Sequence, residues 1–392
     1  MATIEPELKK VLERQHYSIV GTHSAVKICE YTKKSLRDED TCYKNKFYGI
    51  NSHQCVQMTP ALNYCSNFCT FCWRPLEYNQ GQIIEDIDGP EFIVEESVKA
   101  FNKLLNGFKG NVKANQKKYR ESRDPQHFAI SLTGEPTIYP KIKELVDEVN
   151  RQGKTSFLVT NGMYPEQLEN ITPTQLYVSI PASNELSFLK IDRPRVKNAW
   201  AKLLQSLDIL NRKGKEGIRT VMRVTVMKGM NMDHPEEFAE LVKRADPWFI
   251  EVKSYMWLGY SQDRLKQENM PEYEETKAFG LEIAKHCGYR YIDGKSESRV
   301  ILLMKRDEKD RWIQFEKIKE EALLKVAKEK EEKKEEKEKK EGIKKEINII
   351  ETMKQIRQHD ESAVSLACHD SEPVKTKENT SFIPLELVQI KN

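Results

Sequence analysis

The chain has 392 residues, of which 38% are hydrophobic and 32% are charged. This length suits one barrel-sized domain with a sizeable core, followed by an extension. The formal net charge of +3 excludes binding of nucleic acid through overall positive charge, so such a partner must meet a local basic patch. The charged N-terminus and the lack of a long apolar run exclude a signal peptide and a membrane span, so we expect a cytoplasmic protein without membrane contact.

Six of the eight cysteines lie in the first part of the chain, between Cys29 and Cys72. In a reducing compartment this clustering indicates metal or redox chemistry rather than disulfides. Cys29, Cys42 and Cys55 follow one another at equal intervals. Taken alone, they are as compatible with a zinc site assisted by His53 as with an iron-sulfur cluster. We assign residues 1–53 to an N-terminal segment that carries these ligands.

Residues 54–305 alternate short apolar runs with longer charged stretches, which is typical of strand-helix units around a parallel sheet. The predicted strands are Gln54–Pro60, His127–Leu132, Thr155–Val159, Gln175–Ile180, Ile218–Val226, Trp248–Ser254 and Arg299–Lys305. Polar or glycine-containing stretches follow these runs. In a β/α barrel such stretches meet at the carboxyl ends of the strands, so we expect them to form one active-site mouth.

The composition changes beyond Arg306, where lysine and glutamate dominate residues 307–345. Such a charge run is typical of a solvated helix or a disordered segment. Apolar residues then recur at helical spacing, which predicts a short amphipathic helix that docks on another surface. These residues are Ile343, Ile347, Ile350 and Met353. We therefore assign residues 306–392 to a Lys/Glu-rich helical or disordered extension.

Cys65, Cys69 and Cys72 place three thiolates within eight residues. Three cysteines can hold three irons of a four-iron cluster and leave the fourth iron without a protein ligand. A structural zinc site ordinarily needs four protein ligands, and no second cysteine pair follows downstream. The spacing therefore favours a cluster with one open iron.

The three cysteines, with the aromatic Phe71 before the last of them, resemble the C-x-x-x-C-x-aromatic-C motif of the radical S-adenosylmethionine (radical SAM) superfamily. The resemblance implies a partial (β/α)6 TIM-like barrel, over residues 54–305. It also implies that S-adenosylmethionine chelates the open iron and yields a 5′-deoxyadenosyl radical when the cluster is reduced. Phe71 would pack beside the adenine.

Further residues of the chain match this superfamily at the ends of predicted strands. Gly134 and Glu135 resemble the GEP segment, in which backbone and a carboxylate receive the methionyl ammonium. Other strand-end residues occupy positions that in the superfamily commonly meet the ribose and carboxylate of the cofactor. They are Thr160, Asn161, Ser179, Arg223 and Thr225.

The equally spaced Cys29, Cys42 and Cys55, together with the C-W-R-P ending at residues 72–75, resemble the archaeal-type tRNA 4-demethylwyosine synthase family from about residue 16 to 305. This resemblance implies a second four-iron cluster on these three cysteines. It implies a radical condensation of N1-methylguanosine, next to the anticodon of tRNA-Phe, with two carbons of pyruvate. It also implies a monomer that receives electrons from a separate ferredoxin or flavodoxin.

Lys44 and Lys46 lie beside Cys42, and the family resemblance suggests that a lysine holds pyruvate as a Schiff base. We favour Lys44, with Lys46 in reserve. An amine that forms a Schiff base with the carbonyl of pyruvate must be neutral, and a partly desolvated metal site nearby favours the neutral form. The alternative is that both lysines bind tRNA phosphates, which is the usual task of lysines beside a nucleic-acid site.

Two basic stretches are candidates for tRNA contact. The first is a glycine-containing stretch with Tyr119 among its cations, which are Lys109, Lys113, Lys117, Lys118, Arg120 and Arg123. The second consists of Arg193, Arg195 and Lys197. A solvated helix face explains the first stretch equally well.

Two rival functions remain at this stage. One is a radical enzyme that acts on a protein, such as a glycyl-radical activase, although such activases usually carry ferredoxin-like C-x-x-C pairs. The other is a zinc-containing RNA-binding module without catalysis, which would contain zinc and lack iron.

Overall fold

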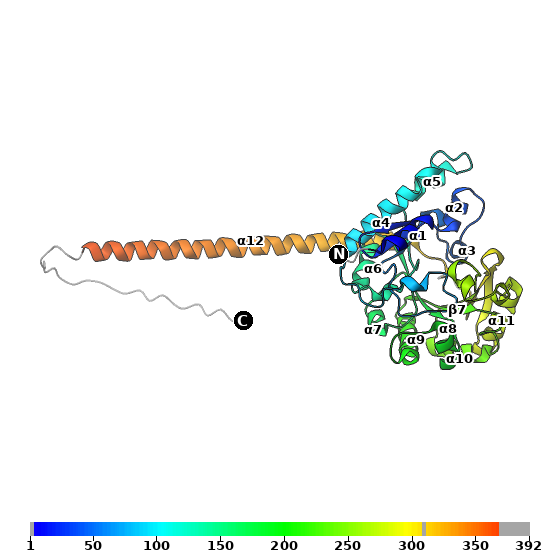
Figure 1. Cartoon of the computed structure of the whole chain (residues 1–392). Coiled ribbons are helices and arrows are strands. Elements are labelled where there is room, and N and C mark those ends of the chain that lie inside the picture. The colour runs from blue at the N-terminus through cyan, green and yellow to red at the C-terminus, as the bar shows by residue number, and fades with distance from the viewer. Residues whose placement is uncertain (1–3, 308–310, 368–392) are drawn as a thin grey trace. The chain divides into compact units, whose positions relative to one another are not determined.

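The computed structural model describes residues 4–307 and 311–367, with side chains described as far as Arg357 (Figure 1). Contacts divide the chain into two compact units, Met1–Val326 and Ala327–Asn392. The extension that we assign to residues 306–392 lies partly outside the described residues. The domain boundaries at residues 53 and 305 stay predictions.

One mixed sheet of ten strands organises the first unit, in the order β1-β2-β3-β4-β5-β6-β7-β8-β10-β9. The six strands from β3 to β8 are parallel and follow chain order, whereas the pairings at both edges are antiparallel. The strands are β1 (Tyr17–Val20), β2 (Ser24–Lys27), β3 (Cys55–Thr59), β4 (His127–Ile130), β5 (Thr155–Thr160), β6 (Gln175–Ile180), β7 (Arg219–Val226), β8 (Phe249–Ser254), β9 (Arg290–Lys295) and β10 (Val300–Met304).

All seven predicted apolar runs are strands. No end of these strands differs from the predicted bound by more than two residues. The first six are the parallel strands. The seventh run is β10, which lies antiparallel to β8. The strands β1, β2 and β9 were not predicted, because β1 and β2 have only four residues and all three carry polar residues on at least one face.

Helices that connect the parallel strands lie around the outside of the sheet (Figure 1). Their apolar sides bury the outer face of the strands in one large core. The α-helices of the described residues, of which α4 to α10 lie between the parallel strands in the chain, are α1 (Pro6–Arg14), α2 (Glu30–Leu36), α3 (Tyr43–Tyr48), α4 (Pro90–Leu104), α5 (Gln116–Ser122), α6 (Ile142–Arg151), α7 (Pro165–Leu168), α8 (Glu185–Asp192), α9 (Ala199–Lys215), α10 (Pro235–Ala245), α11 (Tyr273–Cys287) and α12 (Phe315–Ala367).

The inner face of the sheet is filled by α3, the short helix between Cys42 and Gly49. Tyr43, Phe47 and Tyr48 belong to the same buried cluster as Phe249 of β8 and residues of four other strands. The rings of Tyr48 and Phe249 lie 5.1 Å apart in an edge-on arrangement, which is favourable for aromatic pairs. The N-terminal segment is therefore part of the same core as the sheet.

Inner-face positions become more exposed toward the carboxyl ends of the strands. Because side chains alternate along a strand, every second residue points to the inner face. The partly exposed ones near the carboxyl ends are Val159, Ser179, Arg223, Thr225 and Lys253. Apolar side chains fill the amino-terminal half, and a polar mouth opens at the other end.

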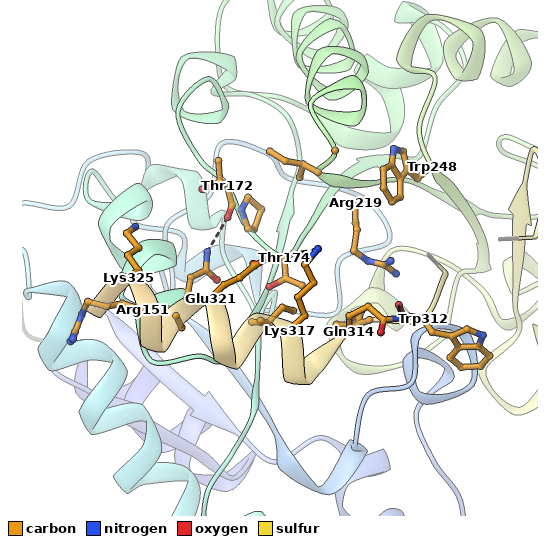
Figure 2. A pocket seen from close by; sticks show the side chains of 17 residues that line it. Arg151, Thr172, Thr174, Arg219, Trp248, Trp312, Gln314, Lys317, Glu321 and Lys325 are labelled. Carbon is orange, nitrogen blue, oxygen red and sulfur yellow. Dashed lines mark hydrogen bonds and ion pairs between the residues drawn. The ribbon is translucent and has the colours of Figure 1, made fainter. Parts of the chain in front are cut away.

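The amino ends of β6, β7 and β8 face the first turns of α12 (Figure 2). A hollow of about 490 Å³ lies between them. Arg219, at the start of β7, donates to the Arg311 carbonyl (2.7 Å) and to Gln175 Oε1 (3.1 Å), and its guanidinium lies over the Phe249 ring. We assign this hollow no chemistry.

The predicted amphipathic stretch of the extension is part of the single helix α12. Ile343, Ile347, Ile350 and Met353 are at least half exposed, so nothing in the described residues covers them. Among the described residues, no helix is long and apolar enough to cross a membrane.

The aromatic filling by α3 can be tested at Phe47, which is completely buried. Phe47→Ala should lower the free energy of unfolding by about 3–5 kcal/mol, because it leaves a cavity inside the sheet. Phe47→Leu should cost less than about 1.5 kcal/mol. Denaturant titration followed by circular dichroism measures both. Phe92→Ala on α4, where the ring is 45% exposed, is the matched control; an equal loss in that variant would contradict the proposed packing.

Candidate functional site

Cys65, Cys69 and Cys72 lie in a loop between β3 and α4, which we call the cysteine loop. Backbone hydrogen bonds anchor this loop. The amide of Phe68 donates to the Asp192 carbonyl (3.0 Å), and that of Thr70 donates to the Ile191 carbonyl (2.8 Å). The Arg195 amide donates in turn to the Ser66 carbonyl (2.7 Å). The end of α8 and the residues after it therefore fix the path of the loop.

Cys65, Cys69 and Cys72 are free thiols in this loop. Burial raises the pKa of Cys65 and that of Cys69, so bare thiolates are disfavoured there without a compensating cation. Arg74, itself buried, donates its Nε to Cys72 Sγ at 3.2 Å. The Thr70 hydroxyl is buried without a hydrogen-bond partner among the described residues. This donor set and its positive surroundings fit a cysteine-bound iron-sulfur cluster.

Gly134 allows the turn after β4 to approach the cysteine loop. Its φ of +72° lies in the left-handed region, and an added Cβ would lie 1.7 Å from the Ala61 carbonyl oxygen. The next amide, that of Glu135, donates to the Tyr64 carbonyl at 2.8 Å. Only glycine fits both the conformation and the contact. The GEP segment and the cysteine loop are thereby held together.

Glu135 directs its carboxylate into the protein. Oε1 accepts hydrogen bonds from the hydroxyls of Thr137 (2.6 Å) and Thr160 (2.7 Å), and Oε2 accepts from the amide of Asn161 (2.7 Å). The Asn161 side chain donates to Ser66 Oγ at 3.0 Å. Glu135, Thr160 and Asn161 therefore connect two strand ends to the cysteine loop. Sequence reasoning placed all three at the cofactor; the structure shows that they also brace one another.

The other predicted cofactor residues lie around the same mouth. Phe71 is partly buried against the main core. Ser179 of β6 pairs in register with Arg223 of β7, and Thr225 follows two residues later on the same inner face. The side chain of Asn231 ties the loops together by donating to the carbonyls of Pro181 and Thr225, both at 2.8 Å.

The first three cysteines converge on one pocket of about 390 Å³, although they come from different elements. Cys29 and Cys42 precede the first turns of α2 and α3, and Cys55 begins β3. Burial raises the pKa of Cys42 and that of Cys55 to about 12. Trp73, directly after the other cysteine set, lines this pocket too.

His53 does not face these cysteines. Its Nε2 lies 2.9 Å from Glu121 Oε2, and its Nδ1 lies near the Ser35 hydroxyl. Both ring nitrogens thus have partners on the outer side of the segment. The zinc alternative that includes His53 is not supported by this arrangement.

Lys44 and Lys46 point to different places. Lys44 lines the cysteine pocket, is only 7% exposed, and holds its Nζ over the rings of Phe157 (4.6 Å) and Tyr177 (4.7 Å). Lys46 Nζ instead pairs with Asp293 at 2.9 Å on β9, and its side chain is 49% exposed. The structure therefore brings Lys44, and not Lys46, to the cysteines.

Lys253 of β8 is a further cation of this pocket, which sequence reasoning missed. Burial lowers its pKa to about 8, and the nearby charge of Arg223 acts in the same direction. Its Nζ donates to the Ser298 carbonyl. The alternation of β8 could have placed Lys253 on the inner face, but no motif distinguishes it from an ordinary strand lysine.

The two basic stretches have different surroundings. In the first stretch, the ion pair of Lys118 with Asp38 (2.6 Å) neutralises part of the positive charge. Arg123 of the same stretch donates to the Asn102 carbonyl. In the second, Arg195 lies over the Phe68 ring of the cysteine loop at 4.6 Å. The second stretch is therefore adjacent to the candidate site.

Comparisons with known proteins agree with this geometry. The model of the radical SAM superfamily matches residues 59–242, and a model described as wyosine base formation matches residues 244–305. An S-adenosyl-L-methionine-dependent tRNA 4-demethylwyosine synthase of Pyrococcus abyssi is 46% identical over 308 residues, which cover 77% of this chain and 89% of the relative. The chain belongs to this synthase family.

The family assignment confirms the resemblance that the cysteine patterns predicted. A synthase of the same name from Methanocaldococcus jannaschii is 40% identical over 78% of this chain and 98% of its own length. A solved structure described as TYW1 with a lysine-pyruvate adduct bound has a TM-score of 0.71 and 38% identity, and covers 80% of this chain and 99% of that one. Membership in the radical SAM superfamily implies S-adenosylmethionine and one four-iron cluster.

The approach of Gly134 to the cysteine loop can be tested by Gly134→Ala. The methyl group would collide with backbone and force a strained φ, so the unfolding free energy should fall by about 2 kcal/mol or more. Reconstituted protein should also hold less iron. Gly107→Ala is the control, because nothing lies within 4 Å of a Cβ there and the change should stay below about 0.5 kcal/mol. Equal iron in both variants would contradict the role of Gly134.

Proposed function

We propose that the chain forms the tricyclic wyosine base on tRNA-Phe, by radical condensation of N1-methylguanosine next to the anticodon with two carbons of pyruvate. The observation that carries this proposal is the pocket itself. Lys44, Cys29, Cys42 and Cys55 line it together with Trp73, which follows the radical SAM cysteines directly. An amine and one cysteine set therefore share one small space, and the residue that follows the other cysteine set borders it.

Cys65, Cys69 and Cys72 would hold the four-iron cluster that S-adenosylmethionine chelates. When bound and reduced, this pair supplies a 5′-deoxyadenosyl radical. Phe71 would pack against the adenine, and Gly134 would present backbone to the methionyl group while Glu135, Thr160 and Asn161 keep that edge in place. Ser179 and Thr225 face the same mouth and would contact the ribose and carboxylate.

Cys29, Cys42 and Cys55 would hold a second four-iron cluster. Their supporting feature is convergence from three separate elements on one pocket, with Lys44 among them. Three cysteine ligands again leave one iron open toward the pocket.

Lys44 would hold pyruvate as a Schiff base. An amine that condenses with the 2-oxo carbon loses water and forms an iminium, which accepts a carbon radical better than the ketone does. The burial of Lys44 supports this role, because the pocket limits the access of water. The related solved structure of TYW1, which has a lysine-pyruvate adduct bound, points in the same direction.

The surroundings of the site give the remaining parts of the proposal. We infer that the six parallel strands form the partial barrel of the superfamily, since α3 fills their inner face. Arg193, Arg195 and Lys197 would contact tRNA phosphates beside the cysteine loop. A separate ferredoxin or flavodoxin would supply electrons to a monomeric enzyme.

The two cysteine sets should separate in metal analysis of anaerobically reconstituted protein. The parental chain should hold about eight irons in two four-iron clusters, and each set should account for about half. Cys69→Ala should lose its share and all formation of 5′-deoxyadenosine. Replacing Cys29, Cys42 and Cys55 together by alanine should lose the other share, yet permit some uncoupled cleavage of S-adenosylmethionine.

Cys287→Ala is the matched control, because this cysteine lies at the end of α11, where its thiol donates to the Ile283 carbonyl. It should keep the parental iron and activity. If Cys69→Ala still formed 5′-deoxyadenosine at the parental rate, Cys69 would not be a ligand of the cluster that S-adenosylmethionine chelates. Unchanged iron in the triple variant would refute the second cluster.

The lysine assignment predicts where pyruvate becomes attached under reduction. Borohydride reduces an iminium to a stable secondary amine, so labelled pyruvate should remain on the parental protein and on Lys46→Ala. Lys44→Ala should carry no label above background. Mass spectrometry of the digested protein locates the adduct, and a labelled Lys44→Ala protein that still forms the tricyclic base would show that Lys44 is not the acceptor.

A further inference from the structure

Two basic side chains beside Lys44 have no role in the function proposed above: Arg223 on β7, which the superfamily resemblance placed at the ribose and carboxylate of the cofactor, and Lys253 on β8. In the register of these parallel strands Arg223 lies opposite Glu251, and Thr225 lies opposite Lys253. The two cations are therefore one inner-face step apart on neighbouring strands. Both line the pocket that contains Lys44 and the first three cysteines.

Arg223 has a buried donor with nothing to bind. Its Nε is buried and finds no hydrogen-bond partner among the described residues. A buried donor of a charged group is costly when it stays unpaired, so native structures normally provide it with a partner. An anionic ligand in the pocket would supply such a partner.

The buried carboxylate in register with Arg223, that of Glu251, is engaged through one oxygen only, because its Oε2 has no hydrogen-bond partner among the described residues. Glu251 is fully buried, and its Oε1 accepts hydrogen bonds from the hydroxyls of Tyr48 (2.8 Å) and Tyr177 (3.2 Å). Its charge favours the cationic form of Arg223. Lys44, Arg223 and Lys253 line the pocket together with one acidic residue, Glu297, whose carboxylate lies 3.6 Å from Lys295.

We propose that Arg223 and Lys253 bind the carboxylate of the 2-oxo acid whose 2-oxo carbon Lys44 holds. The inference rests on the proposed function and adds what selects its small substrate. A guanidinium offers paired donors that match a carboxylate. An ammonium has three donors, of which Lys253 directs one to the Ser298 carbonyl. Neutral ketones would gain nothing from either side chain, so the pair makes the pocket specific for 2-oxo acids.

A second carboxylate could reach the same cations, namely that of the methionyl group of S-adenosylmethionine. The position of Arg223 favours the 2-oxo acid. Arg223 lines the pocket of Cys29, Cys42 and Cys55, whereas the Glu135 network is bonded to the other cysteine loop through Asn161 and Ser66. The experiment therefore measures both ligands.

The test uses the full-length, anaerobically reconstituted protein and the concentration dependence of borohydride trapping. Labelled pyruvate and labelled methyl pyruvate share the 2-oxo carbon, but only pyruvate carries the charge. Arg223→Gln should raise the half-saturating concentration of pyruvate by about tenfold or more and that of methyl pyruvate by less than about twofold. Lys253→Gln should change the two half-saturating concentrations in the same way. At saturating pyruvate, both variants should still carry label on Lys44.

Three further arms complete the design. Arg223→Lys should recover part of the pyruvate affinity, because it keeps the charge and loses the paired donors. Arg244→Gln, which replaces an exposed arginine paired with Asp208, should change neither half-saturating concentration. Equilibrium dialysis should give the same dissociation constant for S-adenosylmethionine in Arg223→Gln and in the parental protein.

The outcomes that overturn the inference are distinct. An equal loss for both probes would mean that Arg223 only supports the fold, and an unchanged half-saturating concentration of pyruvate would mean that its carboxylate binds elsewhere. Weaker binding of S-adenosylmethionine with unaltered trapping would assign Arg223 to the methionyl carboxylate. A parental protein that traps no pyruvate would instead refute the Lys44 assignment, and with it the basis of the inference.

Discussion

The packing of α3 against the inner face of the sheet fixes the depth at which chemistry can occur. Phe47 and Tyr48 fill the amino-terminal half together with inner residues of the strands, and no polar ligand could be held there without removing them. The partly exposed inner-face residues, such as Ser179, Arg223 and Lys253, lie between this layer and the carboxyl ends of the strands. The same helix starts directly after Cys42 and carries Lys44 in its first turn. One hydrophobic insertion thus closes the base of the site and supplies two of its functional groups.

Two contacts connect the cysteine loop to its neighbours, which are the turn after β4 and the pocket of Cys29, Cys42 and Cys55. Gly134 lets the turn after β4 touch the cysteine loop, and Trp73, at the end of that loop, extends to the pocket of the first three cysteines. Trp73 also stacks on Tyr17, with the Lys27 ammonium over both rings, so the antiparallel edge of the sheet supports the loop from outside. A displacement of either contact would change the distance between the methionyl side and the pyruvate side of the proposed site.

Much of the parallel sheet was predictable, because strands that are buried on both faces are continuous apolar runs bounded by polar turns. The edge strands were not, since β1 has only four residues, β9 begins with two exposed residues, and neither is a continuous apolar run. The cysteine sets were found through spacing, which is a local property of the chain. Lys253 and the bracing role of Glu135 were missed because each depends on which strands are neighbours. Local patterns reveal ligands that are close in sequence, whereas partners contributed by separate strands require the register.

The distribution of charge in the mouth follows from this register. β7 and β8 bring Arg223, Glu251 and Lys253 to adjacent inner positions, and the hydroxyls of Tyr48 and Tyr177 hold the single carboxylate from below. The cations are left on the side that opens to the pocket, where burial makes each of them dependent on an anionic partner. The side chains that stabilise the lower layer therefore also set which basic side chains face the pocket above it.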